Sequence, residues 1–110
     1  MIDDTIEKIE HRVMDVRTLN ANQKRELLAL LTTLKDELAE LPSAQAENAE
    51  SIKRFADVSA HEATRNSTDR DLLELAVEGM SQSVKGFETS HPRLVEVVNS
   101  MAVTLSNLGI

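Results

Sequence analysis

The chain has 110 residues, 41% of them apolar and 28% charged, with a formal net charge of −7, two Phe and no Cys, Trp or Tyr. That length suits one domain with its own core, and the absence of Cys excludes disulfides, thiolate metal sites and cysteine nucleophiles. The acidity argues against nucleic acid, whose binding depends on Lys and Arg, and against anionic membrane surfaces.

Large apolar residues recur at steps of four, three, four and three in four separate stretches of the chain. The stretches are 2–16, 27–41, 73–87 and 94–108. The average step of about 3.5 residues keeps one helix face turned towards a neighbouring helix. The sequence therefore predicts a single all-α domain over residues 1–110. We expect an elongated bundle of antiparallel helical hairpins, four to five helices in all, with coiled-coil-like packing.

Residues 1–41 predict an antiparallel helical hairpin. The first helix is expected over residues 3–17. Asn20 is a good N-cap for the second helix, and Gln23 three positions later completes the spacing of a capping box. The second helix should end at Leu41, because the next residue is a proline.

Residues 43–68 carry a weaker signal, since the segment is rich in alanine and has few bulky side chains. Ile52 and Phe55 lie three positions apart and would anchor one face of a helix. Two interpretations remain open at this stage. The segment is either a helix with a close-packed alanine face or a mobile arm that becomes ordered on contact.

Residues 69–110 predict a pair of helices. The first should start after Thr68, which has capping-box spacing to Asp71, and should continue to Glu88. Gly79 and Gly86 flank its apolar stripe, which favours the close approach of another helix over simple tolerance of glycine.

The last helix should begin at Pro92, because a proline loses nothing in the first helical turn. Ser90 or His91 would cap it, and Ser90 has the better oxygen acceptor. The apolar stripe then continues to Leu108, and Gly109 is suited to terminate the helix.

The closing segment resembles an uncharacterised bacterial family of short all-helical proteins. Its members end in a His-Pro-x-Leu helix and a terminal Leu-Gly-Ile. The residues that carry the resemblance are Phe87, His91, Pro92, Leu94, Leu105, Leu108, Gly109 and Ile110. Residues 43–68 look like an insertion relative to the shorter members. The resemblance implies an all-helical fold, and it supplies no activity, substrate or site residues.

Catalytic and metal-binding patterns are weak. Glu7, His11 and Asp15 follow one another at i, i+4 spacing, which is also typical of a solvated helix face. Glu88 and His91 have the spacing of a di-iron motif, but a helix boundary separates them and no second such motif exists. We therefore predict no catalytic residue, no metal site and no cofactor. The alternative is a helical bundle that binds a small ligand or a metal.

Targeting and membrane signals are also weak. Residues 1–4 lack the basic and apolar regions of a secretory signal. The longest apolar run, 27–31, is far shorter than the roughly 20 residues that span a bilayer. The sequence thus predicts a soluble, cytoplasmic protein without a membrane span.

The last helix points to self-association, because no charged side chain follows Glu96. Depletion of charge is typical of an interface or of a buried helix. We expect a homodimer with this helix near the two-fold axis, and intramolecular burial of the helix is the competing explanation. The predicted interface residues are Leu94, Val98, Met101, Thr104, Leu105 and Leu108. The function predicted on this basis is that of a non-catalytic structural or interaction protein. A further, unidentified protein partner is compatible with this function.

Overall fold

The fold is all-α, as the sequence predicts. The computed structural model describes residues 5–108, and this part of the chain contains no β-strand. Its helices are α1 (Thr5–Asp15), α2 (Ala21–Ala39), the short 3-10 helix η1 (Ser43–Gln45), α3 (Ala46–Ala63), α4 (Arg70–Gln82) and α5 (Pro92–Leu108). Among the described residues, no helix is long and apolar enough to cross a membrane.

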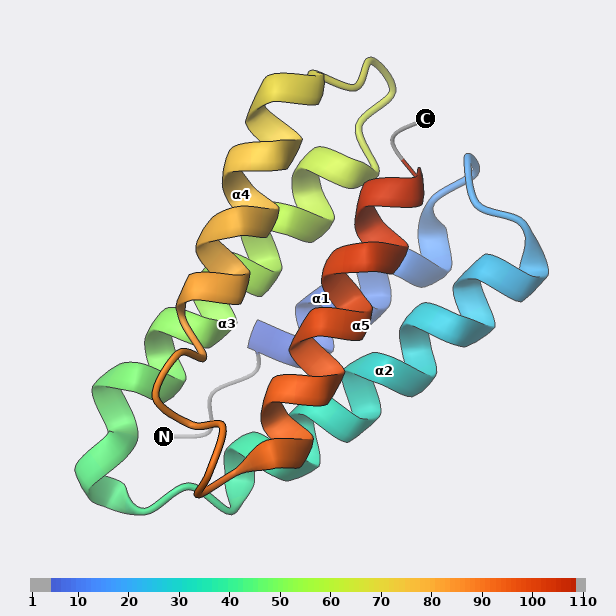
Figure 1. The fold of residues 1–110 in the computed structure, drawn as a ribbon. Helices are drawn as coiled ribbons and strands as arrows, with labels where there is room; N and C mark the ends of the chain where they lie inside the picture. The colour runs from blue at the N-terminus through green and yellow to red at the C-terminus, as the bar shows by residue number, and fades with distance from the viewer. Residues whose placement is uncertain (1–4, 109–110) are drawn as a thin grey trace.

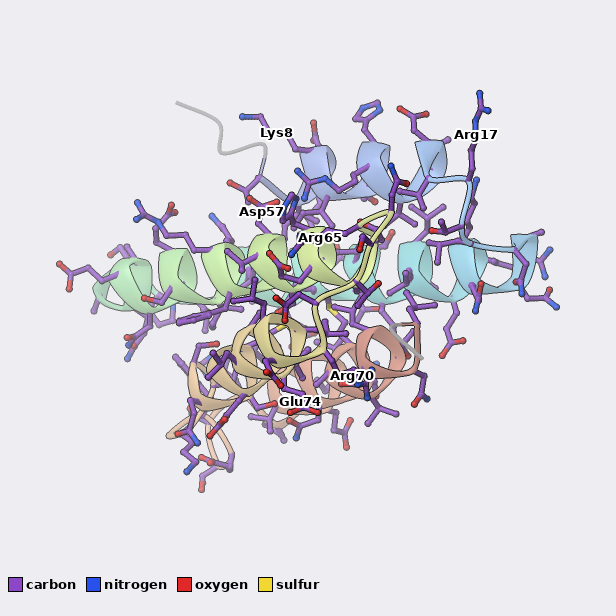
Figure 2. All side chains as sticks on the ribbon, turned by 90° about the horizontal axis from the view of Figure 1, so that it is seen from above. Lys8, Arg17, Asp57, Arg65, Arg70 and Glu74 are labelled. Atoms are coloured by element: carbon purple, nitrogen blue, oxygen red, sulfur yellow. The ribbon has the colours of Figure 1, made fainter. Side chains whose placement is uncertain are left out.

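The helices form three layers around one core. Figure 2 shows α1 on one side, α2 and α3 in the middle, and α4 and α5 on the other side. Helix α1 lies against α2 and α3, whereas α5 lies against α2, α3 and α4 (Figure 1). Every α-helix thus contacts at least two others, and the predicted coiled-coil-like pairing is not supported. The predicted elongation is also slight, because the bundle measures 38 × 26 × 23 Å.

The hairpin of α1 and α2 follows the prediction closely. Asn20 accepts a hydrogen bond from the backbone N–H of Gln23 at 2.8 Å, and its own N–H donates to Gln23 Oε1 at 2.9 Å. This confirms the capping box. Helix α2 ends at Ala39, two residues before Leu41, because the residue that precedes Pro42 is disfavoured in the helical region. Helix α1 ends at Asp15, and residues 3 and 4 of its predicted range lie outside the described residues.

Residues 46–63 are helical, so the first of the two interpretations of the alanine-rich segment describes the structure. Its buried face consists of Ile52 followed by small side chains, namely Ala56, Ser59, Ala60 and Ala63. Phe55 was expected to share this face, but its side chain is 40% exposed. That part of the prediction is wrong, because Phe55 lies at the edge of α3 and reaches over α4.

Gly79 of α4 is the reason Phe55 can lie there. A Cβ atom at Gly79 would overlap the Cδ1 and Cε1 atoms of the Phe55 ring. The predicted close approach of another helix is therefore correct at Gly79. Gly86 has a different role, since its φ of 98° lies in a region that L side chains rarely adopt.

Helix α4 differs from the prediction at both ends. Its N-cap is Asp69, whose side chain accepts from the Leu72 N–H at 3.1 Å, and not Thr68. It ends at Gln82 instead of Glu88, because the chain turns through Gly86. Val84 and Phe87 are nevertheless buried, so the apolar spacing continues through a segment that is no longer helical.

Helix α5 starts at Pro92 as predicted. The residue before it is His91, whose carbonyl accepts from the Val95 N–H at 3.4 Å, so His91 and not Ser90 occupies the cap position. The His91 ring packs edge-on against Phe87 with 5.6 Å between ring centroids. The predicted terminator Gly109 lies outside the described residues.

Candidate interaction surface

The predicted interface residues fall into two groups in the structure. The first group is fully buried within a single copy of the chain and faces the neighbouring helices: Leu94, Val98, Met101 and Leu105. Thr104 and Leu108 form the second group, and both are partly exposed. The apolar stripe of α5 is therefore buried by the other helices of the same chain. A second copy of this fold can reach only the side of α5 that faces away from this stripe.

That side is the α5 outer face, which comprises Asn99, Ser100, Val103, Thr104, Ser106 and Asn107. These six side chains are uncharged, and the exposed Glu96 lies one turn before them on the same side of α5. Val103 is 62% exposed and stands at its centre. A shallow hollow of about 370 Å³ that is wide open to solvent lies on one side of Val103 and is lined by Val77, Ala102 and polar residues of the face. A second hollow of about 370 Å³ on the other side is lined by Glu26 and by the other polar residues of the face.

Neighbouring helices supply the few polar contacts at the border of the α5 outer face. Thr104 Oγ1 donates to Glu26 Oε1 of α2 at 3.1 Å, and Arg70 Nη1 of α4 donates to the Ser106 carbonyl at 3.1 Å. Figure 2 shows Arg70 and Glu74 close together on this side of the bundle, where Arg70 Nε lies 4.0 Å from Glu74 Oε1. The α5 outer face thus consists of one large apolar side chain, Val103, surrounded by uncharged polar side chains, with the charged Glu26 and Arg70 at its border. Such a surface can bind another molecule by shape and hydrogen bonds.

The possible metal ligands on α1 do not form a site. Among residues 5–108, no group of three or more His, Cys, Asp or Glu side chains could hold a metal ion. Glu7 instead accepts from Lys35 Nζ of α2 at 3.1 Å. This hydrogen bond and the negative charge of Glu7 raise the pKa of Lys35 above its ordinary value. Hollows of about 210 and 440 Å³ border this ion pair.

The Glu88 and His91 side chains take part in the turn between α4 and α5. Glu88 Oε2 accepts from the Gly86 N–H at 2.7 Å, and His91 Nδ1 lies 3.0 Å from Ser90 Oγ. Both residues thus have local contacts that account for their positions. The sequence contains no second Glu and His pair with this spacing.

A second exposed apolar group was not predicted from the sequence. It is the α3–α4 strip, formed by Phe55 and Val58 of α3 together with Leu72 and Leu75 of α4. Leu75 is 65% exposed. Leu72, Leu75 and Gly79 are spaced by three and four residues, so they form a row on α4 beside its buried stripe. That spacing is a signal that sequence reasoning could have used.

Comparisons with known proteins identify a family and no function. No curated protein and no solved structure gives a significant match. The model of one family matches residues 27–110, a range that covers more than half of the chain and includes residues 43–68. The chain belongs to this family, which is described as a domain of unknown function (DUF4404).

Proposed function

We propose that this chain is a non-catalytic helical interaction protein of the cytoplasm that forms a homodimer through its α5 outer face. The observation that carries the proposal is Val103, a large exposed apolar side chain on a helix surface with no charged residue after Glu96. Charged side chains are depleted at the centres of protein interfaces. Elsewhere the surface is rich in them, since they make up 28% of the chain.

The shape of the α5 outer face also supports a two-fold arrangement. A two-fold interface joins the same patch of both copies, so the patch must be complementary to itself. Val103 is flanked by a hollow on each side. In a dimer, Val103 of each copy would enter a hollow beside the Val103 of the other. Asn99 and Asn107 would then meet polar side chains at the rim.

Light scattering at low micromolar concentration tests the proposal. We expect the wild-type chain to have the mass of two copies and Val103→Lys to have the mass of one, because a charged side chain would replace an apolar one at the centre of the interface and would have to lose its hydration there. Ala29→Lys is the matched control. Ala29 is exposed on α2, opposite the buried leucines of that helix, and this variant should remain dimeric.

A wild-type chain with the mass of one copy would contradict the proposal, as would a dimeric Val103→Lys variant. The melting temperature of Val103→Lys distinguishes loss of assembly from loss of the fold. The metal content and absorption spectrum of the purified chain test the alternative function. Stoichiometric metal or a coloured ligand would favour a ligand-binding bundle.

A further inference from the structure

The α3–α4 strip is a continuous row of exposed apolar side chains along two packed helices. Helices α3 and α4 run antiparallel and lie side by side (Figure 1). The contact of Phe55 with Gly79 fixes their register. Because residues three and four apart share a helix face, Val58 then lies level with Leu75, and Leu72 lies one turn further along. The strip therefore runs along the outer seam between the two helices.

The cations beside this strip already have partners. On the α3 border, Arg54 Nε lies 3.3 Å from Glu50 Oε1, and Arg65 Nη1 lies 2.7 Å from Glu62 Oε1. The α3 border thus carries positive charges that nearby carboxylates of the same helix balance.

The α4 border is different, because its negative charges are not balanced. Asp71 and Glu78 are exposed and have no ion-pair or hydrogen-bonded partner within the described part of the chain. Glu74 lies between them in sequence and is 4.0 Å from Arg70, the only basic residue of α4. The spacing of three and four residues from Asp71 to Glu74 and Glu78 places these carboxylates along one side of the helix.

We propose that the α3–α4 strip is a docking site for a basic amphipathic helix of another protein. The apolar stripe of that helix would cover Val58, Leu72 and Leu75. Its Lys or Arg side chains would neutralise Asp71 and Glu78 on the α4 border. Docking of an amphipathic helix along an apolar groove is a common mode of recognition. Complementary charge would select a basic helix over an acidic one.

A second copy of this chain fits the strip less well. Its own strip would bring Arg54 and Arg65, which Glu50 and Glu62 already neutralise. Asp71 and Glu78 of both copies would then be close to an interface without new cations. The occupant that satisfies these carboxylates must bring unpaired positive charge of its own.

Titration with two model peptides tests this proposal on the full chain. One peptide is an amphipathic helix of about 18 residues, five turns long, built from Leu and Lys with a single Trp. The other replaces every Lys by Glu. The chain contains no Trp or Tyr, so Trp emission reports on the peptide alone. We expect the Lys peptide to bind with a Kd at least about tenfold below that of the Glu peptide.

Variants locate the binding on the strip. Leu75→Ser should raise the Kd of the Lys peptide about tenfold or more, whereas Met14→Ser should leave it unchanged. Met14 is the matched control, because it is an exposed apolar side chain on α1. Glu78→Lys should reduce the preference for the Lys peptide over the Glu peptide. Leu75 and Glu78 are both exposed, and melting temperatures verify that the variants remain folded.

Three results would overturn the proposal. The first is equal affinity of the Lys and Glu peptides for the wild-type chain. The second is an unchanged Kd for the Lys peptide in Leu75→Ser. The third is a wild-type mass of two copies that falls to one copy in Leu75→Ser, which would assign the strip to a second copy of the chain.

Discussion

Helices α2 and α3 occupy the same layer of the bundle but bury different kinds of face. Helix α2 buries four leucines, Leu27, Leu31, Leu34 and Leu38. Helix α3 buries Ile52 and then only alanine and serine side chains. Both faces are closed to solvent. One chain can therefore exclude water either by filling space with large side chains or by bringing helix backbones close together.

The leucine face of α2 and the alanine face of α3 should respond to mutation in opposite ways. A leucine face fails when a side chain becomes smaller, because a cavity is left behind. An alanine face fails when a side chain becomes larger, because a close-packed interior has no space for new atoms. A large-to-small substitution on α2 and a small-to-large substitution on α3 therefore distinguish the two kinds of packing.

The largest effect is expected for Leu34→Ala on α2. Leu34 is fully buried in the middle of the leucine face. Its truncation should lower the free energy of unfolding by about 2–5 kcal/mol. Urea denaturation measures this change. A loss below about 1 kcal/mol would show that the site collapses around the missing atoms and that the leucine face is not closely filled.

A smaller loss is expected for Ala56→Leu on α3. Ala56 is fully buried on the alanine face. The added atoms should displace a neighbouring helix and lower the free energy of unfolding by about 1–3 kcal/mol. Ala46→Leu, at an exposed position of the same helix, controls for the change in residue type. A more stable Ala56→Leu variant would reveal unfilled space beneath α3.

A gain in stability is expected for Ser59→Ala on the same face. Ser59 Oγ is fully buried and is the one buried side-chain oxygen or nitrogen of residues 5–108 that lacks a hydrogen-bond partner. Removal of such a group should raise the free energy of unfolding by about 1 kcal/mol. A destabilised Ser59→Ala variant would indicate that the hydroxyl has a partner such as a buried water.

The smallest effect concerns the ion pair between Lys35 of α2 and Glu7 of α1. Glu7 raises the pKa of Lys35 above 10.5, so the pair stabilises the fold below that pH, and its contribution disappears as pH rises through the raised pKa. Both side chains are about half exposed, so the effect should be slight. Thermal unfolding between pH 9 and 12 should show a smaller decline in Glu7→Gln than in the wild type. Equal declines would mean that the pair contributes nothing.

Much of the fold could be predicted because local chemistry determined it. The Asn20 capping box depends on two side chains three positions apart, and Pro92 favours a helix start wherever it lies. The end of α4 was predicted wrongly for an equally physical reason. Val84 and Phe87 keep the helical spacing and are buried, although the backbone has already turned. The spacing of apolar residues indicates which side chains are buried, but it does not indicate whether the backbone that carries them is helical.

The candidate surfaces were harder to predict, because exposure depends on which helices become neighbours. The absence of charge after Glu96 distinguishes α5 from the other helices, but it does not show which of its sides other helices cover. Phe55 was expected to anchor the same face of α3 as Ile52, and the position of Gly79 on another helix decides its actual place. The contact of Phe55 with Gly79 and the α3–α4 strip both depend on the register between α3 and α4. A single amino-acid sequence does not reveal that register.

The range matched by the family model is shorter than the folded domain, because it leaves out helix α1. The matched range begins at residue 27, within α2 and after the Asn20 cap. Yet α1 covers α2 and α3 and contributes Ile6, Ile9 and Val13 to the core. A fragment cut at the family boundary would lose one wall of the domain and the start of a helix. Fusion proteins and shortened variants should therefore retain the residues before 27.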